Sequence, residues 1–225
     1  MIRIHVICEG QTEEMFINEM LVDLYATKGI CWLPSLIGKP GHKGGNVRFE
    51  RLQFDIRARL LRDTSAYCTT FFDFYGLPPD FPGKKAAQKR SCSADKARCV
   101  TRALNKQLQK QLGEKPLRRF IPYVQMHEFE GLLFSEPELL ASGLDQTELA
   151  DGFRKTREQF DSPEAINDGS RTAPSKRIKT LFPGYEKPLH GSLAALEIGL
   201  DAMRRECTLF NQWLNDIERL VTKPT

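Results

Sequence analysis

The chain has 225 residues, of which 40% are hydrophobic and 28% are charged, a composition typical of a soluble globular protein. Its longest apolar runs are far shorter than the roughly 20 residues of a membrane-spanning helix, and no signal-type segment is recognisable at the N-terminus, so we expect a cytoplasmic protein with no membrane partner. The net charge of +4 is unevenly distributed: residues 84–119 carry twelve Lys or Arg and two acids, while the remainder has a net charge of −6. A basic block of this kind indicates binding to a polyanion or to an acidic surface of a partner.

The first predicted unit is a strand, a tight turn and a helix. Residues 2–8 form a β-branched run that is too short for a helix, and Gly10 ends it. Thr12 is the expected N-cap of the helix that follows. The apolar side of this helix has four residues at helical spacing, namely Ile17, Met20, Leu21 and Leu24. Glu9 therefore lies at the carboxyl end of a strand, where open α/β sheets bind ligands; a solvated turn residue is the alternative.

The next stretch predicts a second strand, a loop and a second helix. Residues 30–33 read as a short strand that Pro34 stops. The glycine-rich, basic loop at 38–46 lacks the ending of a P-loop, which favours a plain flexible loop. The amphipathic helix that follows has an apolar side formed by Phe49, Leu52, Ile56 and Leu60.

Residues 66–72 are another β-rich run, and Asp73 ends it as Glu9 ends the first. If the two strands are adjacent and parallel, their carboxylates meet at one edge of the sheet. Mg²⁺ takes oxygen ligands from one or two carboxylates together with substrate phosphate. Glu9 and Asp73 are therefore the first candidate metal ligands.

Most of the basic block falls on one predicted helix, which runs from the N-cap Ser93 to Gly113. Its core line is Val100, Leu104, Leu108 and Leu112. A second line, the basic stripe, consists of Arg98, Arg102, Lys106 and Lys110. The two lines are offset by two positions, or about 200°, so the basic stripe lies opposite the core. Contacts to nucleic-acid phosphates and a merely solvated face are both compatible with this pattern.

Residues 118–126 predict a further strand, which Pro122 assigns to a sheet edge or a bulge. His127, Glu128 and Glu130 follow it directly, so acids again come just past a strand. His127 is a candidate for proton transfer, although a histidine packed beside a core strand is the alternative. The scattered cysteines form no C-x-x-C pair, which indicates free thiols in a reducing compartment.

Beyond residue 134 the pattern is helical. Lys176, at the start of a late helix, is a candidate cation for charge that develops in a transition state, with a surface lysine as the alternative. The closing helices offer a docking surface, on which we expect Phe210 or Trp213 to be an exposed apolar anchor.

Several short motifs together resemble one known family. They are Cys8-Glu9-Gly10-Gln11-Thr12-Glu13, Asp73-Phe74-Tyr75-Gly76-Leu77-Pro78, Phe120-Ile121-Pro122-Tyr123, His127-Glu128-Phe129-Glu130-Gly131-Leu132-Leu133-Phe134 and Ala173-Pro174-Ser175-Lys176-Arg177. The chain is identified on these motifs as a member of the domain-of-unknown-function family 4276, a Toprim-like group related to the overcoming-lysogenization-defect (OLD) family nucleases. The resemblance implies metal-dependent phosphodiester hydrolysis beside a separate ABC- or AAA-type ATPase, in defence against phage or foreign DNA. Toprim domains usually carry Asp-x-Asp after the corresponding strand, and Tyr75 replaces the second acid here.

The sequence thus predicts an α/β protein, with a Toprim-like, mainly parallel core over residues 1–134 and a helical part over 135–225. The expected function is that of a Mg²⁺- or Mn²⁺-dependent nuclease that acts on nucleic acid, with DNA favoured over RNA by the resemblance. Glu9 and Asp73 would bind the metal and Glu128 or Glu130 would complete the site. Two alternatives stay open: a non-catalytic subunit that binds nucleic acid or an ATPase, and a phosphohydrolase acting on a nucleotide. A homo-oligomer is left open as well.

Overall fold

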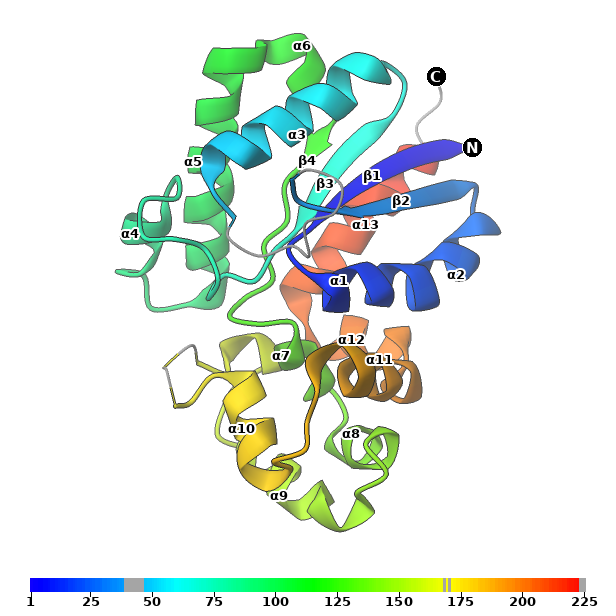
Figure 1. The fold of residues 1–225 in the computed structure, drawn as a ribbon, viewed down its shortest axis with the longest axis vertical. Helices are drawn as coiled ribbons and strands as arrows, with labels where there is room; N and C mark the ends of the chain where they lie inside the picture. Colours follow the sequence, from blue (N-terminus) through cyan, green and yellow to red (C-terminus); the bar gives the residue numbers. More distant parts are fainter. Residues whose placement is uncertain (39–46, 168, 170, 223–225) are drawn as a thin grey trace.

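The computed structural model describes residues 1–38, 47–167, 169 and 171–222. Its centre is a four-stranded sheet in the order β2-β1-β3-β4, in which every strand pairs parallel to its neighbour (Figure 1). The strands are β1 (Ile2–Cys8), β2 (Ile30–Leu36), β3 (Tyr67–Phe71) and β4 (Phe120–Ile121). Helices flank both faces, so the predicted α/β class with a parallel sheet is confirmed.

Two apolar clusters hold the helices against the sheet. One cluster takes Ile4, Val6 and Cys8 from β1, and the other takes Ile7, as the two-residue period of a strand requires. The first face is covered by α1 (Gln11–Phe16), a π-helical turn (Ile17–Leu21), α2 (Val22–Ala26) and α13 (Thr208–Thr222). The second face is covered by α3 (Phe49–Arg62) and α5 (Ser93–Leu112).

The remaining helices are short. They are α4 (Lys84–Ala87), α6 (Glu114–Leu117), α7 (Glu130–Leu133), α8 (Pro137–Gly143), α9 (Ala150–Arg157), α10 (Pro174–Leu181), α11 (Lys187–Ile198) and α12 (Leu200–Glu206), with 3-10 turns at Thr147–Leu149 and Pro163–Ala165. Helices α7 to α12 lie below the carboxyl ends of the strands, and α13 returns to the sheet (Figure 1). The first apolar cluster runs without a break from β1 into α7, α8, α11 and α13, so the helices described after residue 134 share one core with the sheet.

The C-terminal helix corrects one expectation. Phe210 and Trp213 are only 0% and 3% exposed, because they face the sheet. The Trp213 ring stacks on Tyr123 with centroids 4.5 Å apart, and its Nε1 donates to Thr69 Oγ1 at 2.9 Å. The prediction of an exposed anchor at either residue is therefore wrong.

A π-helical turn explains a second correction, in the first helix. Ile17, Met20 and Leu21 are buried as predicted, but Leu24 is 53% exposed and Tyr25 is buried in its place. A π turn holds more residues than an α turn, so the Ile17–Leu21 segment rotates everything after it relative to an α-helical pattern. The N-cap is Gly10 rather than Thr12.

Other element boundaries also differ from expectation. Pro34 does not stop β2, which continues to Leu36 in register with β1; β2 is an edge strand, where a proline is tolerated. The strand predicted over 118–126 shortens to Phe120–Ile121 at the other edge of the sheet, followed by a bridge between Asp73 and Gln125. Helix α5 is capped by Cys92 rather than Ser93, since Cys92 Sγ accepts from Asp95 N at 3.4 Å. Residues 39–46 of the glycine-rich loop lie outside the described residues.

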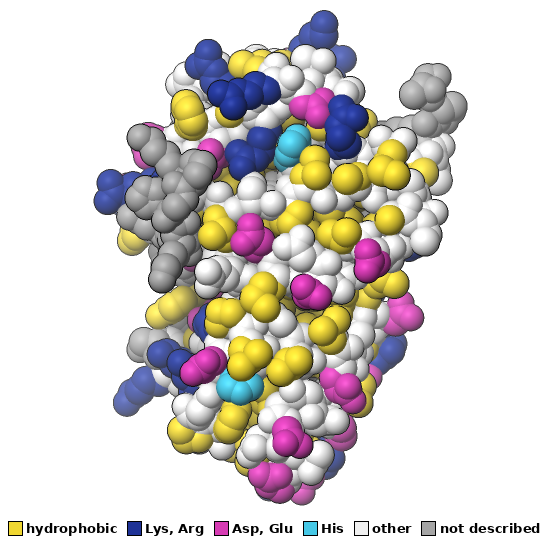
Figure 2. Space-filling view, turned by 45° about the vertical axis from the view of Figure 1, so that its right-hand side comes forward, with side chains coloured by type: hydrophobic (Ala, Val, Ile, Leu, Met, Phe, Trp, Pro, Cys, Tyr) yellow, Lys and Arg dark blue, Asp and Glu magenta, His cyan; other side chains and the backbone are white. Residues whose placement is uncertain are grey.

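The basic stripe of α5 has the predicted orientation. Val100, Leu104 and Leu108 are fully buried, whereas all four members of the basic stripe are exposed. Figure 2 shows another face, on which Lys and Arg side chains gather at the end of the molecule that holds α3 and α6. No helix among the described residues is long and apolar enough to cross a membrane. The six cysteines are free thiols, of which Cys8, Cys68 and Cys207 are buried.

Candidate functional site

The carboxyl ends of β1 and β3 bring Glu9 and Asp73 together. The two strands are parallel neighbours with Cys8 opposite Phe71, so each acid leaves the sheet at the same edge. Glu9 Oε2 accepts a hydrogen bond from the Asp73 backbone N–H at 3.1 Å. Gly76 packs directly against Glu9, since a Cβ atom at this position would lie 2.4 Å from Oε1. The sequence-predicted pair of acids is therefore a real juxtaposition.

The segment that follows β4 brings Glu128 and Glu130 to the same edge. Residues 123–127 run beside 72–75, with Gln125 N donating to Phe72 O and Tyr75 N donating to His127 O, both at 2.8 Å. His127 has a φ of 65°, a left-handed conformation that is uncommon outside glycine. This conformation turns the chain back, so that Phe129 N donates to Asp73 Oδ1 at 2.8 Å.

A fifth acid, Glu13, joins from the first turn of α1. Its Oε2 accepts from Gly10 N at 2.7 Å, and the side chain is buried. We refer to Glu9, Glu13, Asp73, Glu128 and Glu130 as the carboxylate cluster. Its members come from three separate segments of the chain, and all but the half-buried Glu9 are at most 8% exposed.

A lysine that the sequence analysis did not single out is the principal cation of this cluster. Lys187, the first residue of α11, places Nζ 2.9 Å from Glu130 Oε2 and 3.9 Å from Glu128 Oε1. Burial lowers the pKa of Lys187, but Glu130, Asp73 and Glu128 outweigh it and hold that pKa above its ordinary value. Lys187 is therefore charged at neutral pH.

Burial dominates the electrostatics of the acids. It raises the pKa of Glu9, against the opposing hydrogen bond from Asp73 N. Burial and the charge of Glu9 raise the pKa of Glu13 to about 7. Burial and the charge of Glu13 raise the pKa of Asp73 well above its usual range, and burial raises that of Glu130, which Lys187 opposes. The cluster thus places five carboxyl groups around one ammonium group, that of Lys187, and burial favours the protonated form of several of them. A bound cation would favour their ionised form instead.

The other predicted site residues are placed as follows. His127 is buried, with its ring edge-on to Phe74 at 6.2 Å between centroids, as expected for the packing alternative. Lys176 is exposed on α10, next to Ser175, whose backbone N–H donates to Glu128 Oε2 at 2.8 Å.

The donor set suits a hard divalent cation, since it consists of carboxylate oxygens alone. Among the described residues, no three Asp, Glu, His or Cys side chains converge closely enough to hold a metal ion by themselves. Glu128 and Glu130 are already bonded to Ser175 N and Lys187. Glu9 and Asp73 each accept one backbone N–H bond, on a single carboxyl oxygen. As a pair they give the two carboxylates that Mg²⁺ commonly uses when phosphate and water complete its shell.

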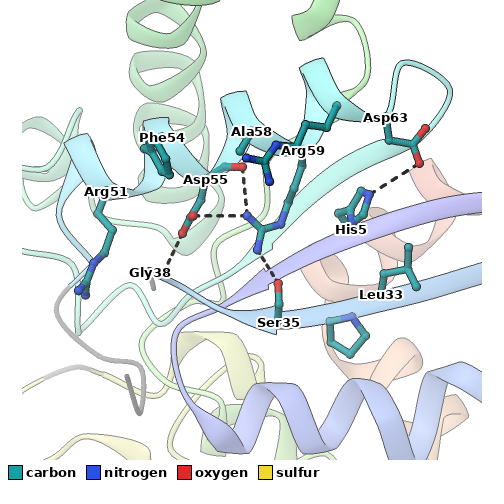
Figure 3. A pocket seen from close by; sticks show the side chains of 12 residues that line it. His5, Leu33, Ser35, Gly38, Arg51, Phe54, Asp55, Ala58, Arg59 and Asp63 are labelled. Carbon is teal, nitrogen blue, oxygen red and sulfur yellow. Dashed lines mark hydrogen bonds and ion pairs between the residues drawn. The ribbon is translucent and has the colours of Figure 1, made fainter. Parts of the chain in front are cut away.

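A hollow of about 1010 Å³ lies away from the carboxylate cluster. It is formed by α3 on one side and by the part of β1 and β2 that α3 does not cover on the other (Figure 3). Its polar groups bond to one another. Arg59 donates to Ser35 Oγ at 2.7 Å and lies 3.5 Å from Asp55 Oδ1, and Asp55 Oδ2 accepts from Gly38 N at 2.7 Å. Because these bonds fasten α3 to β2, we assign this network a structural role.

Comparison with known proteins gives a family and no function. No curated protein and no solved structure matches the chain. One family model, described as Domain of unknown function (DUF4276), matches residues 8–218, which include all five acids of the carboxylate cluster and Lys187. The match covers nearly the whole chain, and the protein therefore belongs to the DUF4276 family.

Proposed function

We propose that the protein is a Toprim-like, Mg²⁺- or Mn²⁺-dependent nuclease. One observation carries the proposal: Glu9 and Asp73 lie side by side at the ends of adjacent parallel strands, with Glu9 Oε2 3.1 Å from Asp73 N. The exposed basic stripe on α5 supports a nucleic-acid substrate rather than a nucleotide, because a small substrate needs only a few positive charges.

Glu9 and Asp73 would hold the metal, which polarises a phosphoryl oxygen and lowers the pKa of bound water when it is present. The Asp73 and Phe129 backbone N–H groups fix one oxygen of each carboxylate. Glu128, oriented by Ser175 N, is the better placed of the two later acids, because its charge acts on Glu9 while Glu130 is fully buried against Lys187.

Lysines near the cluster offer positive charge to the substrate. Lys187 is half-buried and charged, so it can stabilise negative charge that develops on a phosphate. Lys176 is exposed at the start of α10 and remains a second candidate for this role. His127 packs against Phe74, and we give it no more than a supporting role in proton transfer.

Metal binding is the first test, because it does not require activity. Calorimetric titration of the purified chain with Mn²⁺ should give binding that Glu9→Gln and Asp73→Asn each weaken by more than the 10–100-fold typical of outer-sphere changes. Glu19→Gln, an exposed change in the π-helical turn after α1, is the matched control and should bind as the wild type does. Equal Mn²⁺ affinity in all four proteins would refute the site.

The second test is cleavage of duplex DNA, single-stranded DNA and RNA in Mg²⁺ or Mn²⁺, with Glu9→Gln as the control for contaminating nucleases. We expect little cleavage by the isolated protein and stimulation by a separate ATPase of the ABC or AAA type. Two features support such gating: no P-loop motif is present in the sequence, and Tyr75 stands where a second acid would complete the metal site.

Helix α11 provides a route for this control. Leu189, Leu193 and Leu196 form an exposed apolar stripe on it, each about half exposed. Lys187, at the start of the same helix, is bonded to Glu130. A partner bound to this apolar stripe would contact the same helix that positions Lys187. Leu193→Glu should therefore abolish stimulation by the ATPase while Mn²⁺ binding persists.

The second candidate function is a non-catalytic subunit that binds nucleic acid or an ATPase. The ion pair between Lys187 and Glu130 favours it, because an ammonium group already neutralises part of the cluster. Nucleic-acid binding without Glu9-dependent cleavage, even with the ATPase added, would support this function over the nuclease.

A further inference from the structure

A second hollow, of about 600 Å³, opens at the turn that follows Asp73. The turn after Asp73 forms one side of it, with Tyr75, Leu77 and Pro79, and helices α4 and α5 form the other. Tyr75 is 44% exposed, while the neighbouring Phe74 is fully buried. The exposed side chain of Tyr75 thus lies two residues along the chain from Asp73, a candidate metal ligand.

The backbone holds Tyr75 in place next to the acids. Its N–H donates to His127 O at 2.8 Å, which ties it to the segment that carries Glu128. The following residue, Gly76, packs against the Glu9 carboxylate, where a Cβ atom would lie 2.4 Å from Oε1. The backbone of Tyr75 is therefore fixed between the segment that carries Glu128 and the residue that packs on Glu9.

The opposite side of the hollow is basic. Lys84 on α4 is buried, donates to Phe74 O and places Nζ 3.6 Å from the Phe74 ring centroid. Lys96 on α5 places Nζ 5.9 Å from the same ring. Gln88 adds an amide that can both donate and accept. Lys84 is engaged within the protein, so Lys96 and Gln88 are the groups that a ligand can meet across from Tyr75. An exposed aromatic side chain with one ammonium group and one amide nearby suits a ligand that has a flat base and an adjacent phosphate.

We propose that this hollow, the Tyr75 pocket, binds one unstacked base of a single-stranded nucleic acid. The base stacks on Tyr75, Gln88 meets its edge and Lys96 meets the neighbouring phosphate. Single strands bind proteins through this combination of aromatic platforms and positive charge. In a duplex both faces of each base are covered by its neighbours, so the pocket selects against an intact duplex. The role of the pocket in presenting a phosphodiester to Glu9 and Asp73 rests on the proposed nuclease function, whereas its binding does not.

The test measures binding of the full chain without metal. Fluorescence anisotropy is recorded with oligo(dT), oligo(U) and a duplex in EDTA. Tyr75→Ala should weaken binding of single strands by about 5- to 150-fold, which corresponds to the 1–3 kcal/mol that stacking of one base contributes. Tyr75→Phe should keep most of the affinity, because it keeps the ring. Phe54→Ala is the matched control: Phe54 is 69% exposed on α3, away from the cluster, and its loss should change nothing.

A charge variant tests the phosphate contact. Lys96→Gln should reduce the log–log salt dependence of oligo(dT) binding by about 0.7, the value expected for one phosphate contact on a single strand. The oligo(dT) and oligo(U) arms decide between DNA and RNA.

Three outcomes would overturn the proposal: equal affinity of Tyr75→Ala and the wild type for single strands, a Tyr75→Phe variant as weak as Tyr75→Ala, or binding of duplex that depends on Tyr75 to the same extent. If Tyr75-dependent binding is seen but Glu9-dependent cleavage is never found, the pocket stands and the nuclease falls. If cleavage depends on Glu9 but neither binding nor cleavage depends on Tyr75, the nuclease stands and the pocket falls.

Discussion

Replacement of Glu13 by Gln should change how the stability of the protein depends on pH. Glu13 is 5% exposed, and burial together with the charge of Glu9 raises its pKa from 4.5 to about 7. The folded state therefore keeps a proton that the unfolded state loses, over the range between these two values. Stability from this group is complete below pH 4.5 and is lost as the pH rises to about 7.

The size of the effect follows from the same two values. A rise from 4.5 to about 7 corresponds to about 3 kcal/mol of unfolding free energy lost by the wild type across this range. Glu13→Gln keeps an oxygen for the Gly10 N–H and carries no charge. Its unfolding free energy relative to the wild type should therefore increase by about 3 kcal/mol between about pH 4 and pH 8. The loss of the Glu13 charge also eases ionisation of Asp73, which adds to the effect in the same direction.

Urea denaturation at several pH values measures this difference. Trp32 and Trp213 report on it, since both are buried and their ring centroids are 5.7 Å apart in the core. Glu19→Gln, an exposed change in the π turn after α1, is the control and should follow the wild type at every pH. Parallel curves for Glu13→Gln and the wild type from pH 4 to pH 8 would show that burial and the charge of Glu9 do not raise the pKa of Glu13.

Three further predictions concern other parts of the molecule. Gly76→Ala should displace the Glu9 carboxylate, because the new Cβ would lie 2.4 Å from Oε1. Mn²⁺ affinity should fall about 100-fold with little change in the melting temperature. Unchanged Mn²⁺ affinity would contradict the packing of Gly76 against Glu9. Glu164→Ala removes the acceptor for the Leu209 and Phe210 N–H groups at the start of α13. Calorimetry should show that the unfolding free energy falls by about 2–5 kcal/mol and the melting temperature by about 5–15 °C. The exposed Glu158→Ala is the control and should change neither. Replacement of the whole basic stripe by Ala should flatten the log–log salt dependence of duplex DNA binding by about 0.9 for each phosphate that the stripe neutralises, and an unchanged slope would exclude the stripe from the interface.

Local sequence patterns were sufficient to predict that Glu9 and Asp73 follow strands of the sheet and that α5 exposes its basic stripe. A β-branched run ended by a single acid occurs at Glu9 and again at Asp73, and the parallel pairing of their strands was a reasonable inference from the intervening helices. The offset of two positions along α5 correctly separated the buried leucines from the basic stripe. These inferences use the period of single elements and the order in which strands and helices alternate, and both can be read from the amino-acid sequence.

Predictions that depended on a change of period or on distant packing failed. Leu24 is exposed because the π turn before it breaks the α-helical phase, and the residues of that turn contain no clear sign of it. Phe210 and Trp213 are buried because α13 returns to the sheet, where Trp213 donates to Thr69 Oγ1. An amphipathic helix at the end of a chain has an apolar face in either case, so its pattern alone cannot distinguish a core contact from a docking surface.

Lys187 is different, because a local anomaly does point to it. It is the first residue of α11, where the positive end of the helix dipole disfavours a cation. The acid next to it in the sequence is the exposed Glu186 at the N-cap. Pro188 marks the helix start, so this mismatch is visible in the amino-acid sequence alone. The fold gives the reason, since Lys187 Nζ lies 2.9 Å from the buried Glu130 and the attraction of the carboxylate cluster exceeds the small cost at the helix end. A residue that violates a local rule is more informative about a site than one that obeys it.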